Sequence, residues 1–304
     1  MEVFSGIRQE HKAYIDRVIN LFLPEGNEPQ RKIYEAMSYS VLAGGKRLRP
    51  MLMLAAYNMF EGEDREIVEP FMTAIELIHT YSLVHDDLPA MDNDEYRRGR
   101  KTTHAVYGEA LGILAGDALL NYAFETACKA FQKGKHLERI ARAVSVLGKK
   151  SGIYGMLGGQ VVDMEGFSER LTGVEKEELK RRLDYMYQLK TGALLEASLT
   201  IGAILAGATD EEIDKMEHLG GIIGLAFQIQ DDILDVTSTT EVLGKPVLSD
   251  EKNNKLTYVS LLGIDKSREE VEALTKEGLL ILKNLNWDSG FLEELLVSLV
   301  NRKF

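Results

Sequence analysis

The sequence contains one cysteine, Cys128, among its 304 residues. A single cysteine cannot form an intramolecular disulfide, and it cannot supply the ligands of a Cys₄ or Cys₂His₂ zinc site. Its neighbours are apolar and free cysteine is usually buried, so we expect Cys128 to pack in the core as a small hydrophobic residue. The sequence therefore excludes a disulfide-stabilised scaffold and a zinc-finger protein.

Positive charge is scarce relative to negative charge. Lys and Arg number 36 against 48 Asp and Glu, which gives a formal net charge of −12. Duplex nucleic acid and anionic membrane surfaces require basic stripes, so neither is an expected partner. The longest apolar run, Ala193–Ala206, is short for a membrane-spanning helix and contains Glu196. The N-terminal segment has no apolar stretch typical of a signal peptide, so we expect a cytoplasmic protein without a membrane span.

Proline and alternating β-branched residues are also sparse. The chain has 6 prolines and is rich in Leu, Ala, Met, Glu and Lys, which favours long helices. Three capping boxes are predicted to begin helices: Thr172-x-x-Glu175, Thr209-x-x-Glu212 and Ser267-x-x-Glu270. No Pro-rich or Gly/Ser-rich linker divides the chain. We therefore predict one all-α domain over residues 1–304, a large bundle of roughly ten or more helices.

Four aspartates gather in the segment HTYSLVHDDLPAMDND, residues 79–94. They are Asp86, Asp87, Asp92 and Asp94. His79 precedes Asp86 by seven residues, so the two side chains are expected on one helix face. Pro89 interrupts the helix between the aspartates, and we expect Asp92 to come back toward Asp86 through a short bulge.

A second acidic cluster lies in FQIQDDILD, residues 227–235. Its members are Asp231, Asp232 and Asp235. Asp231 and Asp235 are one helical turn apart, where like charges repel unless a cation lies between them. Carboxylates without histidine or thiolate partners favour Mg²⁺ or Mn²⁺ over zinc. Mg²⁺ usually takes one or two carboxylates and leaves its other positions to water and phosphate, so the two clusters predict a cavity where Mg²⁺ bridges the protein to a diphosphate.

The alternative for either cluster alone is a solvated acidic helix face. Both clusters, however, are embedded in apolar helix, and acidic residues are seldom buried unless they are paired or bound to metal. The joint occurrence of the two clusters therefore favours the metal site.

A diphosphate site also needs cations from the protein. The segment GGKRLRP, residues 44–50, places Lys46, Arg47 and Arg49 beside a glycine pair that allows close approach of the backbone to a ligand. This is not a P-loop, because the Gly-x₄-Gly-Lys-Ser/Thr spacing is missing. Further candidate cations are Arg97, Arg98, Lys190, Lys245 and Lys255. Arginine suits bidentate phosphate contacts, and lysine acts as a point charge.

In chain order, GGKRLRP, DDxxxxD followed by RRG, KTG at 190–192, and QxxDDxxD followed by GKP resemble the motifs of the trans-isoprenyl diphosphate synthases. The resemblance runs from about residue 36 to residue 258, and GGQxxD at 158–163 is similar to another family segment. Within the family, the chain is most similar to the bacterial farnesyl diphosphate synthases.

The resemblance implies an isoprenoid-synthase-like bundle around a deep central cavity, and a homodimer. It implies a Mg²⁺-dependent enzyme that joins dimethylallyl or geranyl diphosphate to isopentenyl diphosphate. Three Mg²⁺ ions are expected, with Mn²⁺ as the alternative metal.

The same resemblance assigns roles to individual residues. The metal ions are expected at Asp86, Asp92 and Asp231, with Asp87, Asp232 and Asp235 as partial or outer ligands. Isopentenyl diphosphate is expected at Lys46, Arg49, His79 and Arg98. The allylic diphosphate is expected at Arg97, Lys190, Lys245 and Lys255, with Thr191 and Gln228 beside it. The expected catalytic group is Lys190, Thr191, Gln228 and Lys245; Thr191 and Gln228 turn their oxygens toward the developing allylic cation. His85 is expected to be structural.

Product length is expected to depend on the residues four and five positions before Asp86, which are Ser82 and Tyr81. In the family, an aromatic residue at the fifth position is typical of a floor that stops growth near fifteen carbons. Farnesyl diphosphate is therefore the expected product, and geranylgeranyl diphosphate is the alternative. The helical wheel favours Ser82 instead, because Tyr81 lies about 140° from Asp86. Leu248, where the family commonly has glycine, is expected to stiffen a loop that closes over substrate.

Three other classes explain the sequence less well. A class I terpene cyclase typically carries Asn/Asp-x-x-Ser/Thr-x-x-x-Glu as its second motif and has no need of Lys46, Arg49 and His79. A silent regulatory subunit would have lost an aspartate or a phosphate-binding lysine, and none is lost. An acidic helical interaction module explains neither KTG nor RRG.

Overall fold

The computed structural model describes residues 2–165, 175–238 and 256–300. These residues are helical almost throughout, which confirms the all-α fold class. The sheet that they contain is small: β1 (Tyr96–Arg97) pairs antiparallel with β2 (Arg100–Lys101), with Tyr96 opposite Lys101. This hairpin carries the Arg-Arg-Gly motif directly after the first aspartate cluster.

The number of helices agrees with the expected ten or more. In chain order they are α1 (Glu2–Phe22), α2 (Arg31–Val41), α3 (Leu48–Met59), α4 (Arg65–Asp86), α5 (Thr103–Tyr107), α6 (Glu109–Cys128), η1 (Lys129–Lys133), α7 (Leu137–Ser151), α8 (Met156–Glu165), α9 (Lys176–Tyr187), η3 (Gln188–Gly192), α10 (Ala193–Ala206), α11 (Asp210–Thr237), α14 (Tyr258–Leu262), α15 (Ile264–Lys283) and α16 (Gly290–Val300). Whether residues 1–304 form one domain around a deep central cavity stays a prediction.

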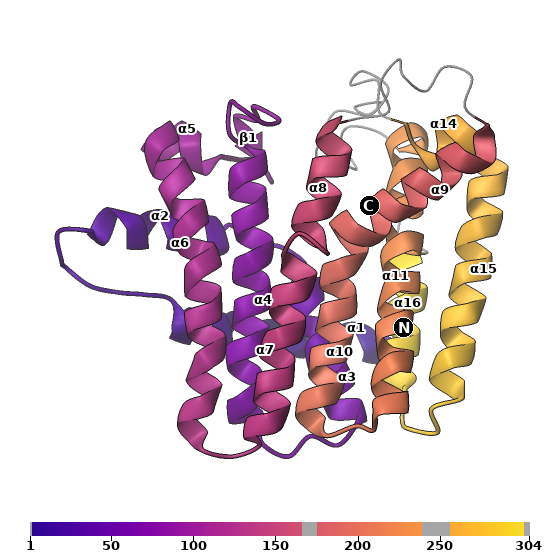
Figure 1. The fold of residues 1–304 in the computed structure, drawn as a ribbon, viewed down its shortest axis with the longest axis horizontal. Coiled ribbons are helices and arrows are strands. Elements are labelled where there is room, and N and C mark those ends of the chain that lie inside the picture. The colour runs from indigo at the N-terminus through magenta and orange to yellow at the C-terminus, as the bar shows by residue number, and fades with distance from the viewer. Residues whose placement is uncertain (1, 166–174, 239–255, 301–304) are drawn as a thin grey trace.

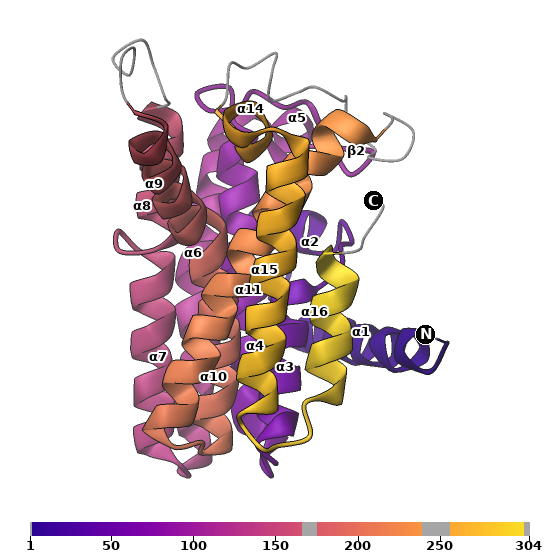
Figure 2. The same cartoon turned by 90° about the vertical axis from the view of Figure 1, so that its right-hand side faces the viewer.

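Most of the long helices lie side by side along one axis, and α1 crosses that axis (Figures 1 and 2). Helix α10 lies at the centre, packed against α3, α7 and α11. Nearly all of its side chains are buried, as expected for a helix that is apolar on every face. The continuous helical run Lys176–Ala206 is long and apolar enough to cross a membrane, but 72% of its most apolar window is buried inside the bundle. That burial is the property of a core helix.

Of the three predicted capping boxes, one is present, one is absent and one lies outside the described residues. Thr209 is confirmed as an N-cap: its side chain accepts from the N–H of Glu212, and the Glu212 carboxylate accepts from the N–H of Thr209 at 2.8 Å. The prediction for Ser267 is wrong, because α15 already begins at Ile264, after Gly263 at φ 86°. Ser267 lies inside that helix and donates its hydroxyl back to the carbonyl of Gly263 at 2.9 Å. Thr172 lies outside the described residues.

The prediction for Cys128 is also wrong, since the side chain is exposed. Cys128 is the last residue of α6. It follows Asn121 and Glu125 at helical spacing, and both of these are exposed. The apolar neighbours that suggested burial point to the other faces of the same helix, so local composition was a poor guide to the position of this residue.

Helices α4 and α11 end at the same end of the bundle, the upper end in Figure 1. The first aspartate cluster follows the end of α4, and the second lies in the last two turns of α11. Helix α8 and the short turn η3 pack against each other, and η3 packs against α11. The fold therefore gathers the motif-bearing segments at one end.

Candidate active site

The chain after α4 folds back on the end of that helix. The N–H of Asp92 donates to the carbonyl of Asp86 at 2.9 Å, and the N–H of Asp94 donates to the carbonyl of Asp87 at 3.2 Å. Asn93 adopts the left-handed conformation, with φ 55°, and so allows the reversal. The bulge expected around Pro89 is confirmed, and it brings Asp86 and Asp92 to one site.

Helix α8 connects the first cluster with Lys190. Gln160 donates from Nε2 to Oδ1 of Asp86 at 2.9 Å, and one turn later Asp163 accepts from Nζ of Lys190 at 2.5 Å. Close backbone packing makes this reach possible: a Cβ on Gly159 would lie 2.2 Å from the backbone N of Lys190. The GGQxxD segment thus supplies contacts to Asp86 and Lys190 that motif spacing alone did not indicate.

The turn η3 continues the connection to α11. It is a wide π-helical turn, a type of irregularity that is frequent at functional sites. Thr191, the next residue after Lys190, donates from Oγ1 to Oε1 of Gln228 at 3.0 Å. Neighbouring residues of η3 therefore contact α8 on one side and α11 on the other.

The aspartates of α11 differ in their surroundings. Asp231 is half-buried, whereas Asp232 and Asp235 are each 2% exposed. Oδ2 of Asp232 accepts from the hydroxyl of Tyr187 at 2.8 Å and from the N–H of Tyr258 at 2.9 Å. Asp232, on α11, therefore links that helix to α9 through Tyr187 and to α14 through Tyr258.

Arg97 is paired with the first cluster. Its Nε donates to Oδ1 of Asp87 at 2.7 Å, and its Nη2 lies 3.5 Å from Oδ2 of Asp94. Asp87 is 4% exposed. Burial raises the pKa of Asp87 to about 6, although the positive charge of Arg97 acts in the opposite direction. Burial likewise raises the pKa of Asp86.

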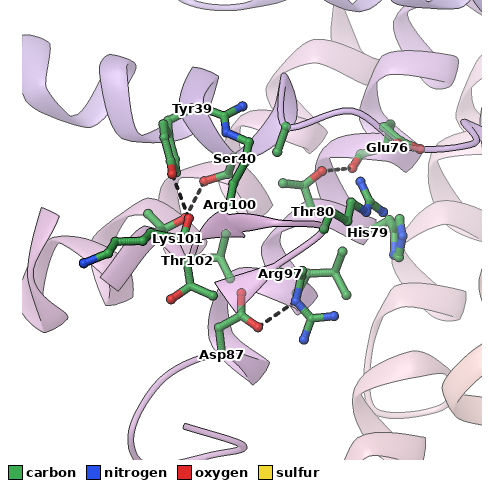
Figure 3. A pocket seen from close by; sticks show the side chains of 15 residues that line it. Tyr39, Ser40, Glu76, His79, Thr80, Asp87, Arg97, Arg100, Lys101 and Thr102 are labelled. Atoms are coloured by element: carbon green, nitrogen blue, oxygen red, sulfur yellow. Dashed lines mark hydrogen bonds and ion pairs between the residues drawn. The ribbon is translucent and has the colours of Figure 1, made fainter. Parts of the chain in front are cut away.

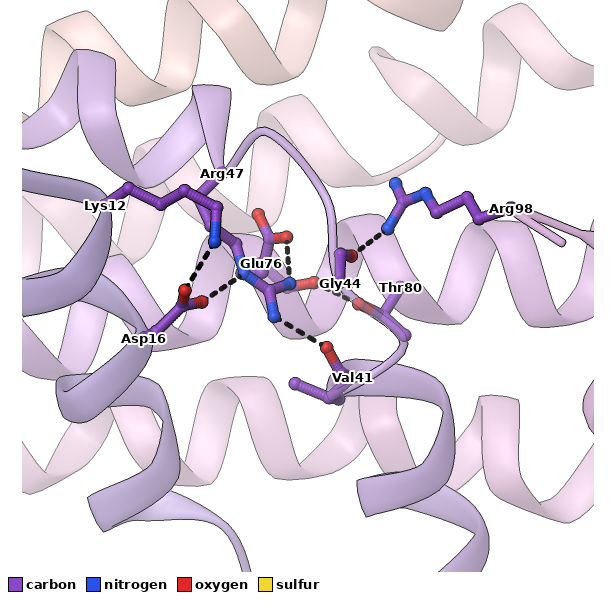
Figure 4. A network of polar contacts seen from close by, with 8 residues as sticks. All are labelled: Lys12, Asp16, Val41, Gly44, Arg47, Glu76, Thr80 and Arg98. Carbon is purple, nitrogen blue, oxygen red and sulfur yellow. Dashed lines mark hydrogen bonds and ion pairs between the residues drawn. The ribbon is translucent and has the colours of Figure 1, made fainter. Parts of the chain in front are cut away.

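The loop that contains Gly44 and Gly45 is in contact with the hairpin that carries the Arg-Arg-Gly motif. Arg98, with φ 53°, donates from its guanidinium to the carbonyl of Gly44 (Figure 4). A Cβ on Gly45 would lie 2.7 Å from Nη1 of Arg98 and would displace that guanidinium, and the φ of 140° at this position also favours glycine. On the other side of the hairpin, the hydroxyl of Tyr39 donates to the carbonyl of Lys101 at 2.7 Å (Figure 3).

His79 lies among the arginines that were expected to bind isopentenyl diphosphate. It lines a pocket with Arg97, Arg98 and Asp87 (Figure 3). Burial, and then the charges of Arg49 and Arg98, lower the pKa of His79 well below its ordinary value, so the ring is neutral at pH 7. Burial lowers the pKa of Arg49 to about 10. Nε of Arg49 is buried and has no hydrogen-bond partner among the described residues.

Lys46, which was also expected to bind isopentenyl diphosphate, is exposed. Lys245, Lys255 and Leu248 lie outside the described residues. The two candidate product-length residues have different environments. Tyr81 is 5% exposed and meets the ring of His85 edge to face at 5.8 Å. Ser82 donates its hydroxyl to the carbonyl of His79 at 2.9 Å within α4.

The carboxylates suit a hard divalent cation. Among the described residues, no three Asp, Glu, His or Cys side chains converge on one point that could hold a metal ion. Mg²⁺ fits such an arrangement, because it usually binds one or two carboxylates and completes its octahedron with water and phosphate. Asp86 and Asp92 at the end of α4, and Asp231 on α11, are oxygen donors of this kind.

Comparisons with known proteins agree with this arrangement. The polyprenyl synthetase family model matches residues 30–280. The chain is 50% identical over 246 residues to a chloroplastic geranylgeranyl pyrophosphate synthase of Catharanthus roseus, which covers 81% of this chain and 67% of that relative. It is 40% identical over 283 residues to the farnesyl diphosphate synthase of Geobacillus stearothermophilus, which covers 93% of this chain and 92% of that relative.

The solved structures agree as well. A geranyltransferase from Helicobacter pylori, complexed with magnesium and isoprenyl diphosphate, has a TM-score of 0.80 at 32% identity and covers 97% of this chain and 96% of its own. The fold and the sequence together define a trans-prenyltransferase, an enzyme that transfers isoprenyl groups. The chain belongs to the polyprenyl synthetase family, which depends on magnesium, and the resemblance seen in its motifs is confirmed.

Several residues that contact the predicted site residues were not themselves predicted from the sequence. Gln160 and Asp163 stood within a recognised segment, so a signal existed although their partners did not follow from it. Tyr187 and Tyr258, which bind Asp232, carried no signal, because each lies outside every motif.

Proposed function

We propose that this prenyltransferase condenses dimethylallyl or geranyl diphosphate with isopentenyl diphosphate and that its product is farnesyl diphosphate. The observation that carries the proposal is a chain of contacts from one aspartate cluster to the other. Asp86 contacts α8 through Gln160, α8 holds Lys190 through Asp163, and Thr191 contacts Gln228 one turn before Asp231. The ammonium group of Lys190 and the carboxylates of both clusters therefore belong to one connected set of residues at one end of the bundle, where two diphosphates and their metal ions would bind.

In this proposal, Asp86, Asp92 and Asp231 hold Mg²⁺, with Asp235 beside Asp231. When bound, Mg²⁺ stabilises the negative charge of the departing diphosphate. Arg97 and Lys190 bind the allylic diphosphate, and the sequence adds Lys245 and Lys255 to this group. Their positive charges favour cleavage of the allylic C–O bond.

Thr191 and Gln228 act on the carbon skeleton. Thr191 donates its hydroxyl hydrogen to Gln228, so the lone pairs of its oxygen remain available to the allylic cation. The double bond of isopentenyl diphosphate, held by Lys46, Arg49, His79 and Arg98, attacks that cation and forms the new C–C bond. A proton then leaves the adjacent carbon for the released diphosphate, so no protein base is required. Apolar walls keep out water, which would otherwise trap the cation as an alcohol.

Two of the expected outer metal ligands are better explained as positioning residues. Asp87 is buried and orients Arg97 through a 2.7 Å contact. Asp232 is buried and accepts from Tyr187 and from the backbone of Tyr258. We therefore propose that the first aspartate of each pair serves the metal and the second fixes a neighbouring element.

Product length is the open choice within the family. Burial of Tyr81 against His85 supports a rigid aromatic floor and hence a fifteen-carbon product. Geranylgeranyl diphosphate is the second candidate, favoured by relatives named geranylgeranyl pyrophosphate synthases at 50% and 46% identity.

The deciding experiment incubates the protein with Mg²⁺, labelled isopentenyl diphosphate and either dimethylallyl or geranyl diphosphate, and sizes the products. Wild type is expected to stop at fifteen carbons and Tyr81→Ala at twenty, with Ser82→Ala as the matched control that keeps the wild-type length. A lengthened product from Ser82→Ala and an unchanged one from Tyr81→Ala would move the floor to Ser82. No incorporation with either primer would reject the proposed reaction.

We also propose a homodimer. Helix α6 exposes Ile113 and Leu114, at 42% and 55%, beside a groove lined by Ile33, Leu111 and Ala118. Contiguous exposed apolar surface is typical of a protein interface. Sedimentation that finds only monomer at micromolar concentration would contradict the proposal. Three metal ions, Mn²⁺ as a substitute and a cytoplasmic location remain predictions from the sequence.

A further inference from the structure

Arg47 lies in the middle of the GGKRLRP segment but does not share the surroundings of its neighbours. Lys46 is exposed and Arg49 is half-buried, whereas Arg47 is 4% exposed. Its guanidinium makes contacts in three directions (Figure 4). Nε donates to Asp16 at 2.8 Å, Nη1 donates to Glu76 at 2.7 Å, and Nη2 donates to the carbonyl of Val41 at 2.9 Å. The guanidinium of Arg47 is therefore occupied by acceptors within the protein and cannot bind a substrate phosphate.

The backbone at Arg47 is in the left-handed region, with φ 50°, at the N-cap of α3. This conformation is unfavourable for a residue other than glycine. Charge-assisted hydrogen bonds to the half-buried Asp16 and the buried Glu76 offset such a cost. The conformation turns the loop into α3, so that Lys46 lies before the turn and Arg49 lies in the first turn of the helix.

Glu76 is the important partner. It is 3% exposed and precedes His79 by three residues on α4, so both side chains lie on one face of that helix. A buried carboxylate needs a cation, because an unpaired charge in the interior is strongly unfavourable. Two other cations are near: Glu76 acts electrostatically on both Arg49 and Arg98. Either arginine would be drawn toward Glu76 if Arg47 did not neutralise it.

Arg49, in contrast, has a buried Nε without a hydrogen-bond partner among the described residues. A buried donor without a partner destabilises the protein, and an anionic ligand that supplied the acceptor would recover that free energy on binding. This donor can serve a ligand only while no protein carboxylate occupies it.

We propose that Arg47 is a positioning residue that holds Glu76 and so keeps Arg49 and Arg98 available for the diphosphate of isopentenyl diphosphate. The inference rests on the proposed function for the identity of the ligand. Lys46, Arg47 and Arg49 look like three equivalent cations in the motif, but in this proposal Arg47 has a different role from the other two. If Arg47 is removed, Glu76 becomes an inhibitor of binding.

The test is a double-mutant comparison. Arg47→Met is expected to raise KM for isopentenyl diphosphate roughly tenfold or more, a loss of about 1.4 kcal/mol per tenfold, while KM for geranyl diphosphate changes less than about threefold. Adding Glu76→Gln removes the stray carboxylate, and the double variant is expected to return to within about threefold of the wild-type KM. Asp16→Asn is the matched control: it removes the negative charge of another partner of Arg47 but leaves Glu76 neutralised, so KM should stay near the wild-type value.

Three results would overturn the inference. These are an unchanged KM in Arg47→Met, a double variant as impaired as the single one, or an Asp16→Asn variant as impaired as Arg47→Met. The last would mean that loop anchoring alone matters. If Arg47→Met does not fold, the double variant decides by itself, because it lacks both charges: a wild-type KM supports the inference and a raised KM overturns it.

A second measurement separates this inference from the proposed function. Titration calorimetry with inorganic pyrophosphate, in chelator and without divalent metal, reports anion binding independently of turnover. Affinity is expected to fall in Arg47→Met and to recover in the double variant, even if wild type fails to incorporate isopentenyl diphosphate. Equal affinities in wild type and Arg47→Met would overturn the charge argument whatever the enzyme's reaction.

Discussion

The aspartate cluster at the end of α4 and the cluster inside α11 share the pair Asp-Asp but are built differently. Helix α4 ends at Asp86, and Asp92 returns to it through an exposed loop. In α11 the aspartates lie within continuous helix, and Asp232 and Asp235 are buried. One cluster is shaped by a chain reversal and the other by helical spacing alone.

The second aspartate of the pair nevertheless has a similar environment in the two clusters. Asp87 contacts Arg97, and Asp232 contacts Tyr187 and the N–H of Tyr258, in each case as a buried acceptor. A doubled aspartate on a helix points its two side chains about 100° apart, so both cannot face one metal ion equally. The two aspartates of each pair therefore have different surroundings, which supports the proposal that they have different functions. Substituting the first and the second aspartate separately tests it.

The largest effect is expected for the first aspartates. Asp86→Ala and Asp231→Ala should each lower kcat for isopentenyl diphosphate incorporation by about a thousandfold or more, because each removes a carboxylate that we propose holds the metal beside the departing diphosphate. Steady-state assays with labelled substrate measure this, and circular dichroism checks that the fold is retained. A folded variant with near wild-type kcat would remove that residue from the metal site and break the comparison.

A smaller and different effect is expected for Asp232. Asp232→Ala should lower the free energy of unfolding by about 2–4 kcal/mol, because it leaves a buried hydroxyl and a buried N–H without their acceptor. Asp231→Ala should change the same quantity by less than about 1 kcal/mol. Chemical denaturation of the pair measures both values. Equal destabilisation of the two variants would show that first and second aspartates do not differ in this way.

These residues also show what could be predicted from the sequence. The capping box at Thr209 and the bulge before Asp92 follow from local spacing and from the position of Pro89, and both were confirmed. Partners could not be predicted, since Asp232 finds Tyr258 from another helix, 26 residues further along the chain. Local composition misled at Cys128 for the same reason, because the packing of whole helices decides which face is covered.

The smallest expected effect concerns His79, which belongs with neither aspartate cluster but lies among the arginines beside the first. Its pKa in the folded protein is lowered well below the ordinary 6.5 by burial and by neighbouring arginines. The unfolded chain therefore binds more protons than the folded protein below pH 6.5, so stability falls as the pH is lowered through that value. One such group contributes a slope of at most about 1.4 kcal/mol per pH unit.

His79→Asn should remove that contribution, so its unfolding free energy should depend less steeply on pH between pH 5 and pH 6.5 than that of the wild type. Denaturation series at constant ionic strength measure the two slopes. His11, whose pKa is also lowered by burial, provides a comparison outside the site, because His11→Asn should reduce the same slope for the same reason. Parallel curves for His79→Asn and wild type would mean that His79 binds a proton as readily in the folded protein as in the unfolded chain, which would contradict a lowered pKa beside Arg49.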